Sequence, residues 1–348
     1  SGPTRAPAER PVARPTGPYP DVVARPSRPS RPSRPSRSFR AFVQRNGHDR
    51  VPGRGTERTA VVALRVAWLV LPVALGPTVA DALHDMASGP RSTASVALWV
   101  LWAIGLTATL VPLPVTLTAL RVGAPALAVA AAWSAPAGEG ALRTMPGMLV
   151  AAVVVVAAFS APTADRFVDG ASYGDERRFQ LRAPGPVALL LGPLATVVVI
   201  LGLVLGPVLL IGRHWVAGAA AICLGLPPAG LAARALHQLS RRWIVLVPAG
   251  FVLHDHLALA EPTLIQRAGL ARIGAAPADT DALDLTQQAR GLALEVRCRE
   301  PHDVLPSDRG RTTSARAVEV RPVEAFLCSP IRPDVVLADA SRRHLPVG

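Results

Sequence analysis

Residues 186–211 read PVALLLGPLATVVVILGLVLGPVLLI and contain no charged side chain. An α-helix needs about 20 predominantly apolar residues to cross the hydrocarbon core of a bilayer, so this stretch is long enough to span a membrane. It belongs to an almost continuous apolar block from Ala60 to Leu236, which short charged segments interrupt. The block contains enough apolar sequence for about six crossings. We therefore expect an integral membrane protein.

The interruptions divide the apolar block into six expected transmembrane helices. These are residues 60–82, 95–120, 122–135, 145–163, 186–211 and 215–236. The third is short and rich in alanine and glycine, so a re-entrant segment is the alternative at that position. With one crossing fewer, the carboxyl terminus would lie on the opposite side of the membrane from the amino terminus.

The first 58 residues form a segment of different composition. They contain thirteen arginines against four acidic residues, and the triplet Arg-Pro-Ser repeats from Arg25 to Ser36. Because so few of its side chains are large and apolar, this segment cannot bury enough surface to offset its conformational entropy. We predict a disordered tail that binds anionic membrane lipids, with about 1 kcal/mol for each arginine near the surface. The regularly spaced arginines are Arg25, Arg28, Arg31, Arg34 and Arg37.

The net charge of +13 does not by itself indicate a nucleic-acid-binding protein. Most of the excess lies in the tail, where no aromatic residue interrupts the repeat and no folded platform is expected, so nucleic acid is a weak alternative partner. Every basic residue other than histidine is arginine, and Ala, Gly, Pro and Val are abundant. This composition is typical of the codon usage of a GC-rich bacterium, which makes the cell membrane the expected location.

The arginines that flank the apolar segments predict the orientation, because cytoplasmic loops carry an excess of basic residues. With the amino terminus in the cytoplasm, the tail, Arg121 at the break between the second and third crossings, the loop 164–184 and the arginines around residue 241 all lie on the cytoplasmic side. The outer interruptions then contain one arginine each, namely Arg91, Arg143 and Arg213. We therefore expect a multi-pass protein with both termini in the cytoplasm.

From residue 237 onward the sequence changes to short runs of β type. Residues 241–259 read RRWIVLVPAGFVLHDHLAL, which predicts a hairpin with Ala249 and Gly250 as its turn. Further strands are expected at residues 263–266, 269–273, 282–285, 292–297 and 317–320, and a terminal helix at 334–343 after Pro333. The chain is therefore divided into a tail (1–58), a helical transmembrane bundle (59–236) and a β-rich domain (237–348), which would be a small sandwich or barrel closed by one helix.

The hairpin residues Val247–Asp255 and the terminal segment Ser329–Arg343 carry a family resemblance. This region resembles the bacterial pleckstrin-homology-like domains that are attached to membrane helices. The layout of the whole chain is similar to polytopic membrane proteins common in actinobacteria. The resemblance implies a role in scaffolding or envelope organisation, with no reaction to carry over.

Three sequence features are candidate sites. Gly202 and Gly206 have the spacing that lets membrane helices approach closely, either within the chain, in a homo-oligomer or by chance. The charged loop 165–178, which includes Arg177 and Arg178, either docks on the C-terminal domain, binds a partner or lipid, or is simply solvated. The run His254-Asp255-His256 could contribute to a metal site, although a polar hairpin edge is the preferred interpretation.

The sequence contains no pattern that indicates an enzyme. We find no Gly-rich phosphate loop, nucleophile elbow or HExxH motif, and we predict neither a cofactor nor a metal. The expected crossings after the first have no ionisable residue in their interiors, which argues against ion-coupled transport. We expect a non-enzymatic scaffold or regulator of cell-envelope or division machinery, with unknown protein partners. The alternative is a transporter or channel for a neutral or lipid-like substrate, with a polar cavity lined by Thr107, Thr109, Thr116 and Thr118.

Overall fold

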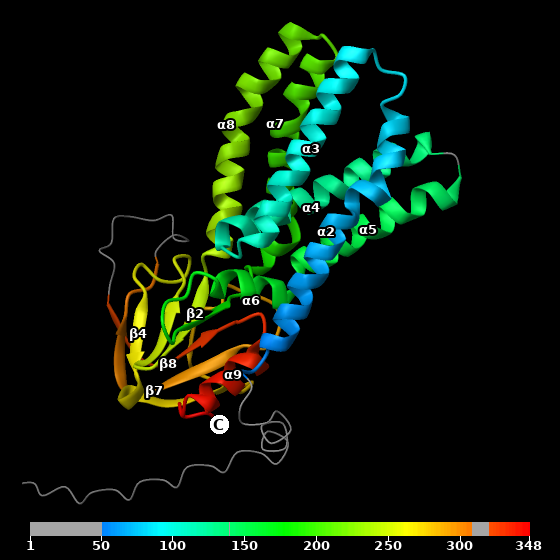
Figure 1. Ribbon diagram of the computed structural model, residues 1–348. Coiled ribbons are helices and arrows are strands. Elements are labelled where there is room, and N and C mark those ends of the chain that lie inside the picture. The colour runs from blue at the N-terminus through cyan, green and yellow to red at the C-terminus, as the bar shows by residue number, and fades with distance from the viewer. Residues whose placement is uncertain (1–50, 139, 308–319) are drawn as a thin grey trace, which may run out of the picture. The chain divides into compact units, whose positions relative to one another are not determined.

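The computed structural model describes residues 51–138, 140–307 and 320–348. Within these ranges six helices are long and apolar enough to cross a membrane, in agreement with the number predicted from the sequence (Figure 1). They are α2 (Arg54–Ala82), α3 (Ser88–Leu110), α4 (Pro114–Ser134), α5 (Ala141–Phe159), α7 (Gly192–Ile211) and α8 (Trp215–Ser240). A 3-10 turn (Ala135–Ala137) extends α4, and a π-helical turn (Val187–Leu191) precedes α7.

The predicted tail overlaps the first of these helices. Residues 1–50, with the arginines of the Arg-Pro-Ser repeat, lie outside the described residues. Residues 54–58 were assigned to the same tail, and in the structure they form the first turn of α2. The assignment to the tail was wrong for these residues because Glu57 is buried in contacts with the C-terminal part of the chain.

The outward faces of the six helices are apolar. Val73, Val216 and Leu224 have exposed fractions of 78, 87 and 77%. Apolar surface of this kind on helix after helix would drive aggregation in water, whereas hydrocarbon solvates it without cost. The exposed surface is therefore consistent with a multi-pass membrane protein.

The break between the second and third crossings lies at Pro112, not at Arg121 as predicted. Leu113 has an extended backbone (φ −131°, ψ 157°), and Pro114 is the first residue of α4. A proline disfavours helical backbone in the residue before it, and its ring fits the first position of a helix. The prediction was wrong because it followed the charge of Arg121 rather than the two prolines. As a result α4 is a full-length crossing, and Arg121 lies inside it.

Helix α2 lies at the centre of the contacts among the first four crossings. Leu64 of α2, Leu117 of α4 and Val154 of α5 are fully buried. Two tryptophans join α2 to α3, because the indole of Trp68 donates to the carbonyl of Trp102 (3.0 Å) and the indole of Trp102 donates to the carbonyl of Trp68 (2.9 Å). In a bilayer no water is present to bond these N–H groups, so the reciprocal pair satisfies both of them.

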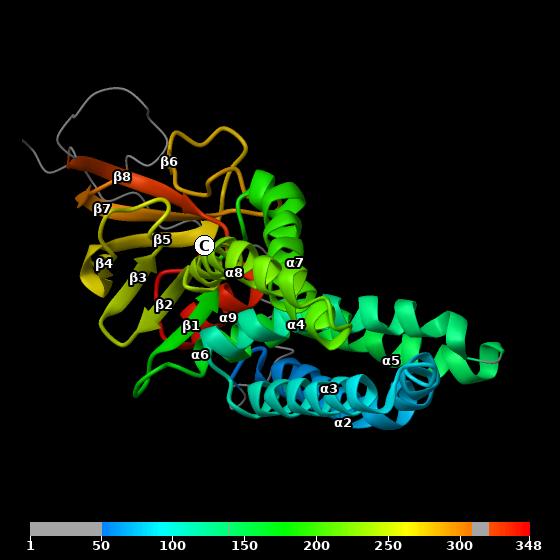
Figure 2. The same ribbon diagram turned by 90° about the horizontal axis from the view of Figure 1, so that it is seen from above.

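Helices α7 and α8 run side by side in both views (Figures 1 and 2). The two glycines of the predicted packing motif face α8. A Cβ atom on Gly202 would lie 2.5 Å from the carbonyl oxygen of Gly225 and 2.7 Å from the Cβ of Ala229, and one on Gly206 would overlap Ile222. The structure thus places Gly202 and Gly206 in a contact within the chain.

Two four-stranded sheets form the β region. The first has the antiparallel order β1 (Arg177–Gln180), β2 (Trp243–Val247), β3 (Gly250–His254) and β4 (Thr263–Gln266). The second has the order β5 (Leu270–Ala275), β7 (Leu294–Val304), β8 (Arg321–Cys328) and β6 (Leu283–Asp284), with β6 parallel to β8. Helix α9 (Pro333–Arg342) follows β8, and Phe179, Phe251 and Phe326 belong to the core that the two sheets and α9 share.

Most of the predicted strands are present, with three differences. Val247 pairs with Gly250, so the hairpin turn is Pro248–Ala249, one residue earlier than predicted. The last strand among the described residues is β8; of the predicted strand at 317–320, residues 317–319 lie outside the described residues and Val320 is not in a strand. Strand β1 comes from the loop between the fourth and fifth crossings, which the sequence division assigned to the bundle, and it pairs with β2 at the edge of the first sheet (Figure 2).

The segment that leads to β1 also contains a short helix. The fourth crossing was predicted to end at Thr163, but α5 ends at Phe159 and Ser160 begins α6 (Ala161–Asp169). The hydroxyl oxygen of Ser160 accepts a hydrogen bond from the N–H of Thr163 (3.4 Å), as expected for a helix N-cap. The charged loop therefore docks on the β region, which was one of the alternatives that the sequence left open.

The packing of α7 on α8 predicts opposite effects for two glycine substitutions. Gly202→Ala forces a Cβ against the backbone of α8 and should destabilise the protein by about 1–3 kcal/mol. Gly230→Ala, in α8, meets no atom within 4 Å and should be neutral or stabilise the helix by up to about 1 kcal/mol. Denaturant titration of the detergent-solubilised protein measures both, and equal effects would contradict the packing.

Candidate functional site

A cluster of buried ionic side chains joins the apolar helices to the β region. Its members come from α2, α6, β1 and the segment that contains α9. Glu57, Asp165 and Arg177 are each 1% exposed and Asp339 is fully buried. We call this set, together with Arg332, the junction cluster.

Glu57 accepts two hydrogen bonds from arginines that are distant in sequence. Arg177 donates from Nη2 to Oε1 of Glu57 at 2.8 Å, and Arg332 donates from Nη1 to the same oxygen at 3.2 Å. Arg332 also donates from Nη2 to the hydroxyl of Thr56 (3.0 Å). The start of α2 is thereby attached both to β1 and to the residue that precedes α9.

Asp339 closes the cluster from the side of α9. Its Oδ1 lies 3.5 Å from Nη1 of Arg177, and it accepts hydrogen bonds from Arg342 (2.7 Å) and Arg343 (2.9 Å). Burial acts to raise the pKa of this carboxyl, but the hydrogen bonds from Arg342 and Arg343 and the charge of Arg177 hold the pKa below its ordinary value. Asp339 is therefore a carboxylate at neutral pH.

Asp165 is the least satisfied member of the cluster. Its Oδ1 accepts a hydrogen bond from the N–H of Gln180 (3.0 Å), while its Oδ2 lies 3.6 Å from Nη1 of Arg332 and accepts no hydrogen bond from the described residues. Burial raises the pKa of this carboxyl to about 7, against the opposing effects of the Gln180 N–H and Arg332. Asp165 thus changes its charge near neutral pH.

Three further interactions fix the points where the chain passes between the apolar helices and the sheets. After α6, Oδ1 of Asp169 accepts the N–H of Arg178 (3.1 Å). After β1, Arg182 donates to the carbonyls of Pro330 (3.1 Å), Ile331 (3.2 Å) and Arg290 (2.8 Å).

After α8, Arg242 donates to both carboxylate oxygens of Asp255 at 2.7 Å, and the two side chains are 1 and 2% exposed. Bidentate arginine–carboxylate pairs are geometrically demanding, so Arg242 fixes the direction in which the chain leaves the bundle.

The chemistry of this arrangement is structural. Removing one partner from a buried ion pair costs about 3–5 kcal/mol because it leaves the other charge uncompensated. The junction cluster and the pair of Arg242 with Asp255 therefore hold the sheets in one orientation on the helices. Within the described residues no group of three or more His, Cys, Asp or Glu side chains is arranged to hold a metal ion.

The structure separates the site residues that the sequence proposed. Arg177 is buried in the junction cluster, so its guanidinium is not presented to lipid or to a partner. Arg178 pairs with Glu176 (2.7 Å) and lies over the ring of Trp243, 5.3 Å from its centre. Arg25, Arg28, Arg31, Arg34 and Arg37 lie outside the described residues.

The run His254-Asp255-His256 is divided between different roles. Asp255 is the buried partner of Arg242, so it is not an exposed edge residue, and its Oδ1 also accepts the N–H of Leu257 (3.0 Å), a local bond of the kind expected for a polar hairpin end. The ring of His254 stacks on Trp243 with 4.9 Å between centres. Burial lowers the pKa of His254, so this ring is neutral at pH 7.

Sequence reasoning missed the acidic half of the junction cluster. Glu57 and its partners Arg177 and Arg332 are 120 and 275 residues apart, so no local spacing connects them. One signal was available at Asp165 and Asp169, which lie four residues apart on either side of Phe167 and Val168, in a short helix where all four are buried. An acid that recurs on the apolar side of a helix indicates a buried partner.

Comparison of the chain with protein-family models, curated proteins and solved structures found no match. The resemblance to pleckstrin-homology-like domains therefore rests on the sequence alone.

The junction cluster predicts that Glu57→Gln is strongly destabilising. The substitution removes the negative charge that compensates Arg177 and Arg332, and we expect a loss of about 3 kcal/mol in the free energy of unfolding in detergent. The matched control is Asp81→Asn at the opposite end of α2, where the pair with Arg143 is only partly buried and should be worth less than about 1 kcal/mol. Similar losses for the two variants would show that the cluster does not hold the structure.

The raised pKa of Asp165 predicts that the free energy of unfolding depends on pH and in which direction it changes. Its folded-state pKa of about 7 is above the ordinary value of 3.8, so between these limits the folded state binds the proton more tightly than the unfolded state does. Stability should therefore fall as pH rises through this interval. Asp165→Asn keeps an oxygen for the Gln180 N–H but cannot ionise, and it should show a smaller fall in thermal midpoint between pH 5 and 8. Parallel pH profiles for the two proteins would contradict the assignment.

Proposed function

We propose that the protein is a non-enzymatic, membrane-anchored scaffold or regulator that presents its β region to proteins of the cell-envelope or division machinery. The observation that carries this proposal is the immobilised junction. Helix α8 ends at Ser240 and β2 begins at Trp243, and one of the two residues between them is the buried Arg242.

A fixed junction suits a platform better than a tethered module. A domain that searches for partners is usually connected by a flexible linker, and its interface with neighbouring domains is small and polar. Here side-chain bonds from Asp169, Arg182 and the buried Arg242 hold the three passages between helices and sheets. The surface of the β region would then have one orientation relative to the membrane, which is what a protein that assembles partners on the bilayer requires.

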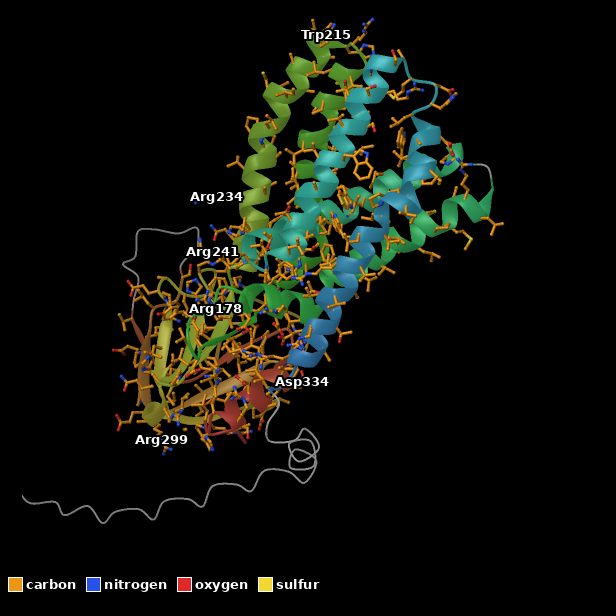
Figure 3. All side chains as sticks on the ribbon, in the orientation of Figure 1. Arg178, Trp215, Arg234, Arg241, Arg299 and Asp334 are labelled. Carbon is orange, nitrogen blue, oxygen red and sulfur yellow. The ribbon has the colours of Figure 1, made fainter. Side chains whose placement is uncertain are left out.

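The distribution of arginine supports a cytoplasmic position for the β region. Arg234 and Arg241 lie at the end of α8 from which the chain enters β2, and Trp215 lies at the opposite end (Figure 3). Near that opposite end the described residues include three arginines, Arg91 in the first turn of α3, Arg143 in the first turn of α5 and Arg213 between α7 and α8. The positive-inside rule therefore favours the cytoplasm for the sheets and for both chain termini.

We further propose that the β region is a pleckstrin-homology-like domain. Its support is the order of elements: antiparallel hairpins come first, and a helix that begins at Pro333 comes last. Such domains commonly present surfaces to other macromolecules, so this identity fits a scaffold.

The alternative of a transporter has less support from the described residues. It requires Thr107, Thr109, Thr116 and Thr118 to line a polar path. Each hydroxyl instead donates to a backbone carbonyl three to five residues earlier in the chain, which satisfies it locally. Thr118 also contacts His237 and Ser240 of α8 at 3.2 and 2.9 Å, which joins α4 to α8 near the sheets.

Proximity labelling tests the scaffold role. A biotin ligase fused to the carboxyl terminus, expressed in cells that make this chain naturally, should enrich envelope or division proteins over a ligase on an unrelated six-span protein. Arg242→Ala frees the β region and should lose these partners while remaining in the membrane fraction. Arg241→Ala, which removes the exposed neighbouring charge, should keep them.

Two results would contradict the proposal. One is that no envelope or division protein is enriched over the unrelated membrane protein. The other is that the Arg241 and Arg242 variants recover the same partners at equal protein levels. A scaffold that depends on a fixed orientation of its β region should lose partners when the Arg242 pair is removed.

A further inference from the structure

Four arginines line a single groove at the start of α2. The groove has a volume of about 460 Å³ and is lined by Arg54, Glu57, Arg58, Val61, Val62 and Arg65 of α2 and by Arg166 of α6. The α2 residues follow the i, i+3, i+4, i+7 spacing of one helix face, and α6 packs beside this part of α2. Two helices thus build the walls of the groove.

The groove has a large excess of positive charge. Its one acidic residue, Glu57, is 1% exposed and is already bonded to Arg177 and Arg332. Arg54, Arg58 and Arg166 are exposed and form no ion pair with the described residues. These three guanidinium groups are therefore available to an anion.

Arg65 is held in position at the deep end of the groove. It donates from Nε to the carbonyl of Thr109 (3.0 Å) and from Nη2 to the carbonyl of Leu110 (3.4 Å), the last residues of α3. These carbonyls have no partner within their own helix, so they orient the guanidinium. Its positive charge is not neutralised by any carboxylate among the described residues.

Along α2 charged side chains come first and apolar side chains follow deeper in the membrane, which is the order of headgroup and acyl chain in a lipid. Helix α2 has 29 residues, whereas about 20 span the hydrocarbon core, so its first turns extend into the interfacial layer. Arg54 and Arg58 come first, and the exposed Val62 follows one turn deeper. A ligand that fits has a negatively charged group in water and an apolar portion in the membrane.

We propose that this groove binds the headgroup of an anionic phospholipid, with its phosphate between Arg54, Arg58 and Arg166 and its acyl chains along Val62. Basic pockets between transmembrane helices on the cytoplasmic side are suited to such headgroups. Arginine contacts phosphate through two parallel N–H donors, which gives more specificity than a diffuse surface charge. The inference does not depend on the scaffold role, because a protein with another function could use the same site.

Binding of single lipids to the full chain tests the proposal. The purified protein is titrated with cardiolipin, phosphatidylglycerol and phosphatidylcholine and examined by native mass spectrometry. We expect the two anionic lipids to remain bound and phosphatidylcholine to dissociate. The double variant Arg58→Gln with Arg166→Gln should weaken anionic lipid binding by about tenfold or more, because it removes two of the three guanidinium groups placed around the phosphate.

The matched control is Arg234→Gln with Arg241→Gln. This variant loses two exposed arginines at the sheet end of α8, and it keeps the tail and the groove (Figure 3). Its affinity should change by less than threefold. Equal thermal midpoints of the two double variants would show that the difference in binding is not a folding defect.

Three outcomes would overturn the proposal. Equal weakening in both double variants would mean that general surface charge binds the lipid. Unchanged binding in the Arg58 and Arg166 variant would mean that the lipid binds elsewhere. Complete competition by millimolar glycerol phosphate would mean that the groove takes a soluble phosphate compound and not a lipid.

Discussion

The guanidinium of Arg177 is the charge on which the rest of the structure depends. Only 1% of this residue reaches solvent, and transfer of an unpaired charge to such a site costs several kcal/mol. Glu57 at 2.8 Å, Asp339 at 3.5 Å and the ring of Phe179 at 4.8 Å compensate it. These partners belong to α2, α9 and β1, so the charge is satisfied only when all three elements are assembled.

This requirement makes the membrane helices and the sheets interdependent. Strand β1 is inserted between two crossings, and it can pair with β2 only after the chain has made two further crossings. The buried ions add specificity to this arrangement, since any other docking of the sheets would leave a charge in a medium of low dielectric constant. Compensation is weakest at Oδ2 of Asp165 and Nη1 of Arg177, whose ionic partners lie at 3.6 and 3.5 Å and which form no hydrogen bond with the described residues. Asp165 is the point at which neutral pH can alter the junction.

The features of the fold that follow from local composition could be predicted from the sequence. The features that depend on contacts between residues far apart in the chain could not. Hydropathy identified six crossings because each must be apolar along its whole length. The boundary at Pro112 was missed since a charge was given more weight than two prolines. Strand β1 reads RRFQ, which is indistinguishable from a solvated loop until Phe179 is seen in the core. The buried acids were beyond prediction because their partners have no fixed spacing along the chain.

The junction cluster and the pair of Arg242 with Asp255 require the β region to have one orientation on the apolar helices. Double electron–electron resonance tests it directly, with spin labels at Thr59→Cys on α2 and Leu264→Cys on β4, two exposed positions, in a chain whose Cys223, Cys298 and Cys328 are replaced by serine. A fixed junction should give a single narrow distance distribution in lipid bilayers. A broad distribution, or several well-separated distances, would contradict it.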